Sequence, residues 1–254
     1  MSTTTRLTAA LLALICTNIA RGAEESHDMQ HMSYDEMATM MGMDDTAAFA
    51  GVTLDQLEAR FADSDEALAW DAQAFYGNDY NKAWLKTEGE HAGGAIENGD
   101  VELLWDRIFS RWWSVQAGGR HDFGEGPSRS WLALGVQGLA PYFLEVEATA
   151  YLGESGRSAA RIKGEYDLRF TQRLILQPKL ELNLYGRDDP RTGHMSGLSD
   201  VEIGLRLRYE LRREVAPYLG VLWLRQVGQT ADLARSRGHD VSDAQLLAGI
   251  RIRF

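Results

Sequence analysis

The sequence predicts an all-β fold, a closed antiparallel transmembrane β-barrel of the outer-membrane type with a disordered Met-rich N-terminal tail. Runs of about ten residues alternate apolar and charged side chains, and the connections between these runs alternate between short and long. No run of about 18 apolar residues is present, which together with a mean hydropathy of -0.31 excludes a bundle of membrane-spanning helices. The 254 residues, of which 44% are hydrophobic, suit one domain of ordinary size.

Residues 1–23 have the features of a secretory signal peptide. The apolar run Leu7–Ile19 follows Arg6 and is about thirteen residues long, which is too short for a spanning helix. The single cysteine, Cys16, lies in this segment. We therefore expect a mature chain outside the cytoplasm that contains neither a disulfide nor a thiolate metal site.

Residues 24–50 are expected to form the disordered tail. They lack tryptophan, follow no helical or strand period, and are rich in Asp, Glu, Met and His. Such a segment buries too little apolar surface to offset the entropy lost on ordering. The stretch His27–Asp45 within it contains six of the chain's eight methionines and two of its six histidines.

Residues 51–254 are expected to form the barrel. In "YFLEVEATAYL" (142–152) and "VEIGLRLRYEL" (201–211), apolar side chains point to one face and charged side chains to the other. Strands of soluble sandwiches usually have five or six residues, whereas transmembrane barrel strands need about 9 to 11. The lengths favour a barrel whose apolar face meets lipid and whose charged face lines the lumen.

The connections predict about twelve strands, or ten if the first hairpin packs elsewhere. Tight connections such as "SR" (110–111) and "TQR" (171–173) alternate with longer ones, among which we place residues 92–100 and 187–200. An even number of strands puts both chain termini on the periplasmic side. The last run, 244–254, ends at Phe254, which resembles the signal that delivers bacterial outer-membrane barrels to their assembly machinery.

Two features of the barrel segment have alternative interpretations. The charged luminal faces indicate either a salt-bridged interior that keeps the barrel rigid or a metal-conducting path. Aromatic residues near strand ends fit interfacial girdles, although each one alone also fits ordinary cross-strand pairing. These aromatic residues are Trp112, Trp113, Trp131, Tyr142, Tyr151, Tyr185 and Tyr218.

Four stretches resemble the CopB/PcoB family of outer-membrane copper-resistance proteins. They are "LAWDAQAFYGNDYNKAWLKTEGE" (68–90), "QAGGRHDFGEGPSRSWLALGVQGLAPYFLEVEATAYL" (116–152), "TQRLILQPKLELNLYGRDDP" (171–190) and "GLSDVEIGLRLRYELRREVAPYLGV" (197–221). The resemblance covers most of residues 68–254, and the tail matches in kind. It implies a bacterial outer-membrane location with the tail in the periplasm, and a periplasmic copper oxidase or copper carrier as partner.

The composition of the tail suits copper. Thioether sulfur is a soft ligand that prefers Cu(I) where no thiolate is present, and imidazole also accepts Cu(II). The expected metal ligands are Met29, Met32, Met37, Met40, Met41, Met43, His27 and His31. The alternative is a Met-rich amphipathic helix that binds a partner. His194 and Met195 form a second soft pair, for which a solvated loop is the better interpretation.

The expected function is that of an outer-membrane copper-resistance protein that binds copper ions and takes part in copper homeostasis by sequestration or transport. The alternative is a small-solute porin or a structural barrel without metal specificity. Enzymatic activity is not expected. His121 and Asp122 are adjacent, but the sequence contains no serine in a recognisable nucleophile motif that they could activate. Copper ions and outer-membrane lipid are the expected partners, and the net charge of -11 argues against nucleic acid.

Overall fold

The computed structural model describes residues 33, 37, 41–42, 47–62 and 66–254. The chain divides into two compact units, Met1–Asp44 and Asp45–Phe254. Residues 1–23, predicted as a signal peptide, and most of the predicted tail lie outside the described residues. Among the residues that are described, no helix is long and apolar enough to cross a membrane.

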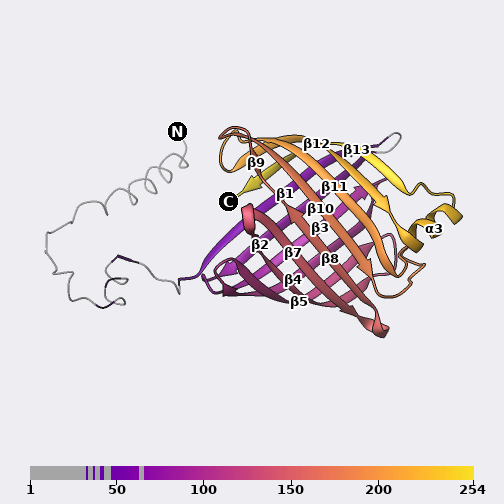
Figure 1. Cartoon of the computed structure of the whole chain (residues 1–254), viewed down its shortest axis with the longest axis horizontal. Coiled ribbons are helices and arrows are strands. Elements are labelled where there is room, and N and C mark those ends of the chain that lie inside the picture. Colours follow the sequence, from indigo (N-terminus) through magenta and orange to yellow (C-terminus); the bar gives the residue numbers. More distant parts are fainter. Residues whose placement is uncertain (1–32, 34–36, 38–40, 43–46, 63–65) are drawn as a thin grey trace, which may run out of the picture. The chain divides into compact units, whose positions relative to one another are not determined.

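The second unit is a closed antiparallel barrel of twelve strands (Figure 1). The first and last strands pair with each other from Thr53 opposite Arg253 to Phe61 opposite Leu246, which closes the sheet. β8 and β9 both pair with β10 and form one interrupted strand. The strands are β1 (Phe49–Phe61), β2 (Glu66–Gly77), β3 (Asn81–Ala92), β4 (Ala95–Ser110), β5 (Trp113–Gly124), β6 (Arg129–Ala140), β7 (Leu144–Gly153), β8 (Ser158–Glu165), β9 (Leu168–Arg169), β10 (Leu174–Tyr185), β11 (Gly197–Tyr209), β12 (Val215–Gln226) and β13 (Ser242–Arg253).

The prediction of twelve strands is therefore confirmed, and the alternative of ten is wrong. The first hairpin, β1 and β2, pairs over its whole length from Phe49 opposite Gly77 to Phe61 opposite Glu66, so it belongs to the barrel. Closure matters physically because an open sheet edge would leave backbone N–H and C=O groups unpaired in an apolar surrounding.

The two ends of the barrel differ in their connections. We call the end that carries Phe49 and Phe254 the terminal end and the opposite end the loop end (Figure 1). The terminal end has short connections, including the 3₁₀ turn η1 (Pro141–Phe143). The loop end carries η2 (Glu154–Gly156), the long β10–β11 connection, and α3 (Gly228–Ser236) between β12 and β13.

One predicted connection is wrong. Residues 92–100 form no long loop, because β3 ends at Ala92 and β4 begins at Ala95. Gly93 and Gly94 have φ values of 59° and 87°, in the left-handed region that a two-residue hairpin turn requires. The pair of glycines therefore closes the hairpin, and residues 95–100 continue the ladder.

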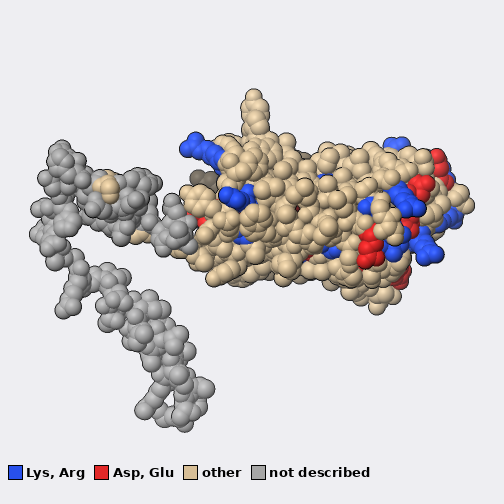
Figure 2. Space-filling view, turned by 90° about the horizontal axis from the view of Figure 1, so that it is seen from below, with Lys and Arg blue, Asp and Glu red and all other residues tan. Residues whose placement is uncertain are grey.

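The barrel is apolar outside and charged inside. Leu132 and Leu134 of β6 are 70% and 60% exposed, whereas Glu58 of β1 and Arg206 of β11 are 0% and 2% exposed. In Figure 2 the middle of the barrel is an uncharged band, and the charged side chains gather toward its ends. A surface this apolar needs an apolar surrounding, and the observed faces match the alternation predicted from the sequence.

Candidate functional site in the barrel lumen

The lumen contains a vestibule of about 680 Å³ that is lined by strand residues and by the connections at the loop end. Its lining includes Glu88, Asp100 and Arg161 from the strands and Asp189 and His194 from the β10–β11 connection. The strands bring these side chains inward because each lies on the charged face of its alternating run. The vestibule is therefore a polar chamber with a carboxylate- and guanidinium-rich wall.

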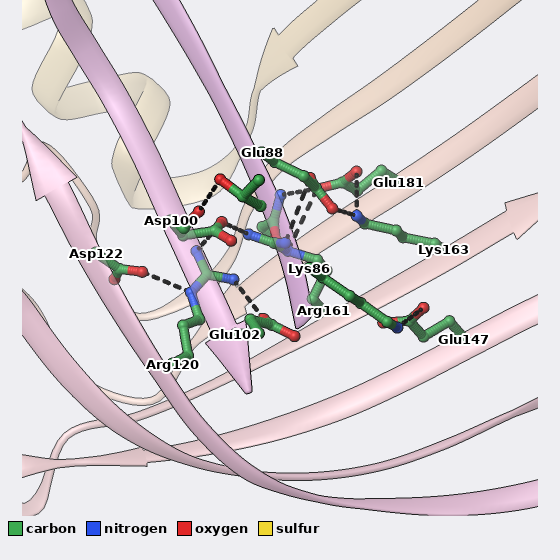
Figure 3. A network of polar contacts seen from close by, with 12 residues as sticks. Lys86, Glu88, Asp100, Glu102, Arg120, Asp122, Glu147, Arg161, Lys163 and Glu181 are labelled. Carbon is green, nitrogen blue, oxygen red and sulfur yellow. Dashed lines mark hydrogen bonds and ion pairs between the residues drawn. The ribbon is translucent and has the colours of Figure 1, made fainter. Parts of the chain in front are cut away.

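Ion pairs cross the lumen between strands that are not neighbours in the sheet (Figure 3). Lys86 of β3 lies 2.8 Å from Glu147 of β7, measured from Nζ to Oε2. Lys163 of β8 pairs with Glu88 of β3, and Arg161 Nη2 lies 3.4 Å from Asp100 Oδ2 of β4. These contacts join opposite walls, so the middle of the lumen is occupied by paired side chains.

Arg120 of β5 connects several carboxylates of the same network. Its guanidinium lies 3.0 Å from Asp100, 3.4 Å from Glu102 and 2.5 Å from Asp122. It also lies over the ring of Tyr151, with 4.9 Å between Cζ and the ring centroid. One planar cation thus holds three carboxylates and an aromatic face, an arrangement that suits arginine better than lysine.

A second cluster extends from the vestibule wall to a pair of side chains outside the lining. Arg206 forms two hydrogen bonds with Glu58, with Nε 3.0 Å from Oε2 and Nη2 2.9 Å from Oε1. Tyr218 donates its hydroxyl hydrogen to Glu58 at 3.0 Å, and Arg206 Nη2 also donates to Gln56 at 3.0 Å. Glu58 and Arg206 are buried and absent from the vestibule lining, so we call them the sealed pair.

Two half-buried carboxylates of the vestibule lack a direct partner. Asp71 of β2 and Glu202 of β11 line the chamber, and within the described parts of the chain neither has a hydrogen bond or an ion pair. Water in the chamber can hydrate both side chains. The chamber therefore has carboxyl groups that no described arginine or lysine contacts directly.

The β10–β11 connection is packed at the mouth of the vestibule. The His194 ring stacks on Tyr185 with centroids 4.3 Å apart, and its Nδ1 lies 3.1 Å from Ser199 Oγ. Met195 donates its backbone N–H to Thr230 Oγ1 of α3 at 3.0 Å. This soft pair was expected in a solvated loop, but these contacts show a half-buried segment held by its neighbours.

Charge at the mouth is arranged around Asp189 and His194. Burial lowers the pKa of His194, and nearby Asp122 and Asp189 offset only part of this effect. Burial raises the pKa of Asp189. Its contacts with Arg129 at 2.8 Å and Arg157 at 3.3 Å lower the pKa by more than burial raises it, so the net pKa lies below the usual value. Asp189 thus remains an anion that fixes two arginines of the loop end.

The predicted aromatic girdle is partly wrong. Trp131, Tyr151 and Tyr218 are buried in the lumen, where Trp131 Nε1 donates to Asp122 at 2.7 Å and Tyr151 donates to Glu102 at 2.7 Å. They share the inward face with the charged residues of their strands. Trp112 and Tyr142 are exposed near the terminal end, as an interfacial position requires. Alternate residues of a strand point to opposite faces of the sheet. This alternation, rather than nearness to a strand end, decides which aromatic side chains face lipid.

Most of the predicted copper ligands lie outside the described residues: Met29, Met32, Met40, Met43, His27 and His31. The two that are described, Met37 and Met41, are one helical turn apart, since the Met41 N–H donates to the Met37 carbonyl at 2.9 Å. In the part of the chain that is described, no three His, Cys, Asp or Glu side chains form a group able to hold a metal ion.

Comparison with known proteins identifies the family. The family model "Copper resistance protein B precursor (CopB)" matches residues 48–254, which are the whole barrel. The chain belongs to the copper resistance protein B family. The resemblance inferred from the four stretches is thereby confirmed, and the protein has a role in copper resistance.

Two relatives of this copper resistance B protein are similar over most of the chain. The copper resistance protein B homolog of Pseudomonas syringae pv. tomato (strain ATCC BAA-871 / DC3000) is 46% identical over 210 residues, or 83% of this chain and 71% of that protein. The copper resistance protein B of Escherichia coli is 45% identical over 203 residues, or 80% of this chain and 69% of that protein.

Solved structures support the fold at much lower identity. The NanC porin has a TM-score of 0.52 with 14% identity, covering 81% of this chain and 100% of its own. The KdgM porin has a TM-score of 0.50 with 13% identity, covering 80% and 99%. At such identities the likeness concerns the barrel architecture alone, and it agrees with the outer-membrane type predicted from strand length.

Proposed function

We propose that this protein resides in the bacterial outer membrane and contributes to copper resistance by binding copper ions with the methionines and histidines of its N-terminal tail. The observation that carries the proposal is the concentration of six methionines and two histidines between His27 and Asp45 in a member of a copper-resistance family. Soft thioethers suit Cu(I), and the two imidazoles extend the set to Cu(II).

The membrane location is supported by the outward face of the barrel. Large apolar side chains such as Leu132, Leu219 and Leu246 are mostly exposed, and they surround a lumen of paired charges. Lipid is the surrounding in which this distribution is favourable. We place the terminal end toward the periplasm, because its connections are short and periplasmic turns of such barrels are short.

Sequestration is the mechanism we favour over transport. Lys86–Glu147 and Arg161–Asp100 cross the lumen, so a copper ion on its way through would have to separate paired charges. A tail on the periplasmic side can hold copper without any passage through the barrel. A periplasmic copper oxidase or copper carrier is a suitable partner, because it would meet the ligands in the same compartment.

The alternative function, a small-solute porin, receives less support. A general porin keeps a water-filled channel, whereas side chains from β3, β4, β7 and β8 meet across this lumen. Copper resistance also explains the Met-rich tail, whereas the function of a general porin does not require such a segment. We propose no catalytic role, since the tail and the ion-paired lumen serve binding and barrel integrity.

The test is to replace every tail methionine with leucine, which keeps size and apolarity but removes the sulfur lone pairs. The variant changes Met29, Met32, Met37, Met40, Met41 and Met43. Cu(I) affinity of the purified protein, measured by competition with a chromophoric chelator, should fall sharply while thermal stability of the barrel stays at the parent value. Met195→Leu, the matched control outside the tail, should bind Cu(I) like the parent.

The opposite result has a defined meaning. If the leucine variant binds Cu(I) as tightly as the parent, the tail is not the copper site. To separate sequestration from transport, copper entry into vesicles that contain the protein can be compared with entry into empty vesicles. A copper flux that depends on the barrel and survives removal of residues 24–45 would contradict sequestration by the tail.

A further inference from the structure

The terminal end of the barrel has an unbalanced charge. Seven exposed arginines lie there, including Arg169 of β9 and Arg253 at the end of β13. We call the other five the rim arginines: Arg107 near the end of β4, Arg111 in the β4–β5 turn, Arg173 before β10, and Arg212 and Arg213 between β11 and β12. Figure 2 shows lysine and arginine predominating at this end, whereas both charge signs occur at the loop end. The exposed acids of the terminal end are fewer: Asp79, Glu145 and Glu214.

The rim arginines have no acidic partner in direct contact. Among the residues that the structure describes, none of the five has a carboxylate within 4.0 Å. Most exposed arginines of the loop end also lack an ion pair, but they stand among exposed acids such as Glu97, Asp188 and Asp243. Five uncompensated guanidinium groups at one end create a positive potential there that can attract an external anion.

Exposed apolar side chains accompany the rim arginines. Phe109 and Trp112 lie next to Arg111 in the sequence, and both are more than half exposed. Phe170 stands near Arg173, and Leu211 precedes Arg212, with both apolar side chains again exposed. Arginine beside exposed aromatic and aliphatic groups is the combination expected where hydrocarbon meets charged headgroups.

The positions of the rim arginines around the barrel favour a partner that extends as a plane around the whole rim. The β9–β10 and β11–β12 connections are adjacent, since the Glu210 N–H donates to the Arg173 carbonyl at 2.8 Å. The β4–β5 turn is separated from them by several strands in both directions around the closed sheet. A protein partner would meet one of these two sectors, whereas the headgroup plane of a membrane surrounds the barrel and meets both.

We propose that the rim arginines bind the phosphate groups of anionic phospholipids in the leaflet at the terminal end. Guanidinium matches phosphate with two parallel hydrogen bonds, and basic groups near an anionic leaflet gain electrostatic attraction. The interaction anchors the barrel at a defined depth and favours the orientation with the terminal end toward that leaflet. This inference rests on the proposed membrane location but not on copper binding.

The experiment uses the full mature chain in lipid nanodiscs without copper. Thermal stability is compared between phosphatidylcholine alone and a mixture with phosphatidylglycerol, at low and at high salt. We expect phosphatidylglycerol to raise the Tm of the parent by at least about 3 °C at low salt, and we expect high salt to remove the rise through screening. The rim variant, with all five arginines changed to glutamine, should show no such rise.

The matched control changes five arginines at the loop end to glutamine: Arg187, Arg191, Arg225, Arg235 and Arg237. It should respond to phosphatidylglycerol like the parent. Inorganic phosphate added to phosphatidylcholine nanodiscs should leave the Tm unchanged, and an equal rise would instead indicate a free-anion site. An unresponsive parent, or a rim variant that responds like the parent, overturns the proposal. Because copper is absent, either result leaves the test of the tail independent.

Discussion

Two ion-pair clusters share the lumen but differ in their access to water. The sealed pair, Glu58 and Arg206, is buried and lies outside the vestibule lining, and Tyr218 completes the hydrogen bonds of the carboxylate. The cluster around Glu88 and Arg161 lines the vestibule, and each of its members has more than one partner. The sealed pair is buried and bidentate, with Arg60 of the vestibule wall as a further partner of Glu58 at 3.0 Å, whereas the other cluster faces the chamber.

This difference indicates which cluster holds the barrel together. Removing Arg206 leaves the fully buried Glu58 with Arg60 alone to compensate its charge, whereas a hydrated network redistributes its partners. The sealed pair joins β1 to β11 across the strands that close the barrel, so its loss should weaken closure itself. The vestibule cluster should instead influence which ions enter.

The largest expected effect is that of Arg206→Met. This change removes the bidentate partner of the fully buried Glu58 and leaves Arg60, whose Nε lies 3.0 Å from Glu58 Oε1, as its cation. The free energy of unfolding should therefore fall by about 3 kcal/mol. Urea unfolding of the detergent-solubilised protein, followed by tryptophan fluorescence, measures it. The double variant Glu58→Gln with Arg206→Met removes both charges, leaves Arg60 paired with Glu90, and should recover much of the loss. If the double variant is no more stable than the single one, the cost is not that of an under-compensated buried charge.

Glu88→Gln in the vestibule should cost less, roughly 1–2 kcal/mol, because water reaches Lys163 and Arg161 and other acids remain near them. The same unfolding assay applies. A loss as large as that of Arg206→Met would remove the distinction between the dry and the hydrated cluster.

Replacing the crossing pair Lys86 and Glu147 with alanines should widen the path through the lumen. The single-channel conductance in a planar bilayer is expected to rise several-fold above that of the parent, while the unfolding midpoint changes little because both charges leave together. Glu145→Ala, on the same strand near its start, serves as the control. Unchanged conductance in the double variant would locate the constriction elsewhere in the lumen.

The smallest effect is expected at the mouth, for Asp189→Asn. The pKa of Asp189 lies below its usual value, so its contribution to stability is complete above about pH 4 and is lost as the pH falls through the lowered pKa. The parent should be more stable than the variant by less than about 1 kcal/mol at neutral pH, because ion pairs that stay in contact with solvent contribute little. Tm values measured from pH 7 to pH 3 should converge at the acidic end, and a constant difference would contradict this assignment.

Much of the fold follows from local pattern. Alternation along β7 and β11 predicts which side chains face lipid, since neighbouring residues of a strand point to opposite sides. The same rule, applied to Tyr151, would have placed it with Glu147 in the lumen rather than in the girdle. Gly93 and Gly94 also indicate a tight hairpin turn. The prediction of a long loop at residues 92–100 was wrong because it gave more weight to the composition of the segment than to this pair of glycines.

By itself the sequence determined the barrel class, the approximate strand number, the two faces of each strand and the soft-ligand chemistry of residues 27–43, because each of these depends on neighbours along the chain. Only the tertiary structure decided that Lys86 meets Glu147, that Arg206 is sealed with Glu58, and that the vestibule opens at the loop end. Contacts across a lumen depend on the stagger and closure of the whole sheet, and no local pattern of residues contains that information.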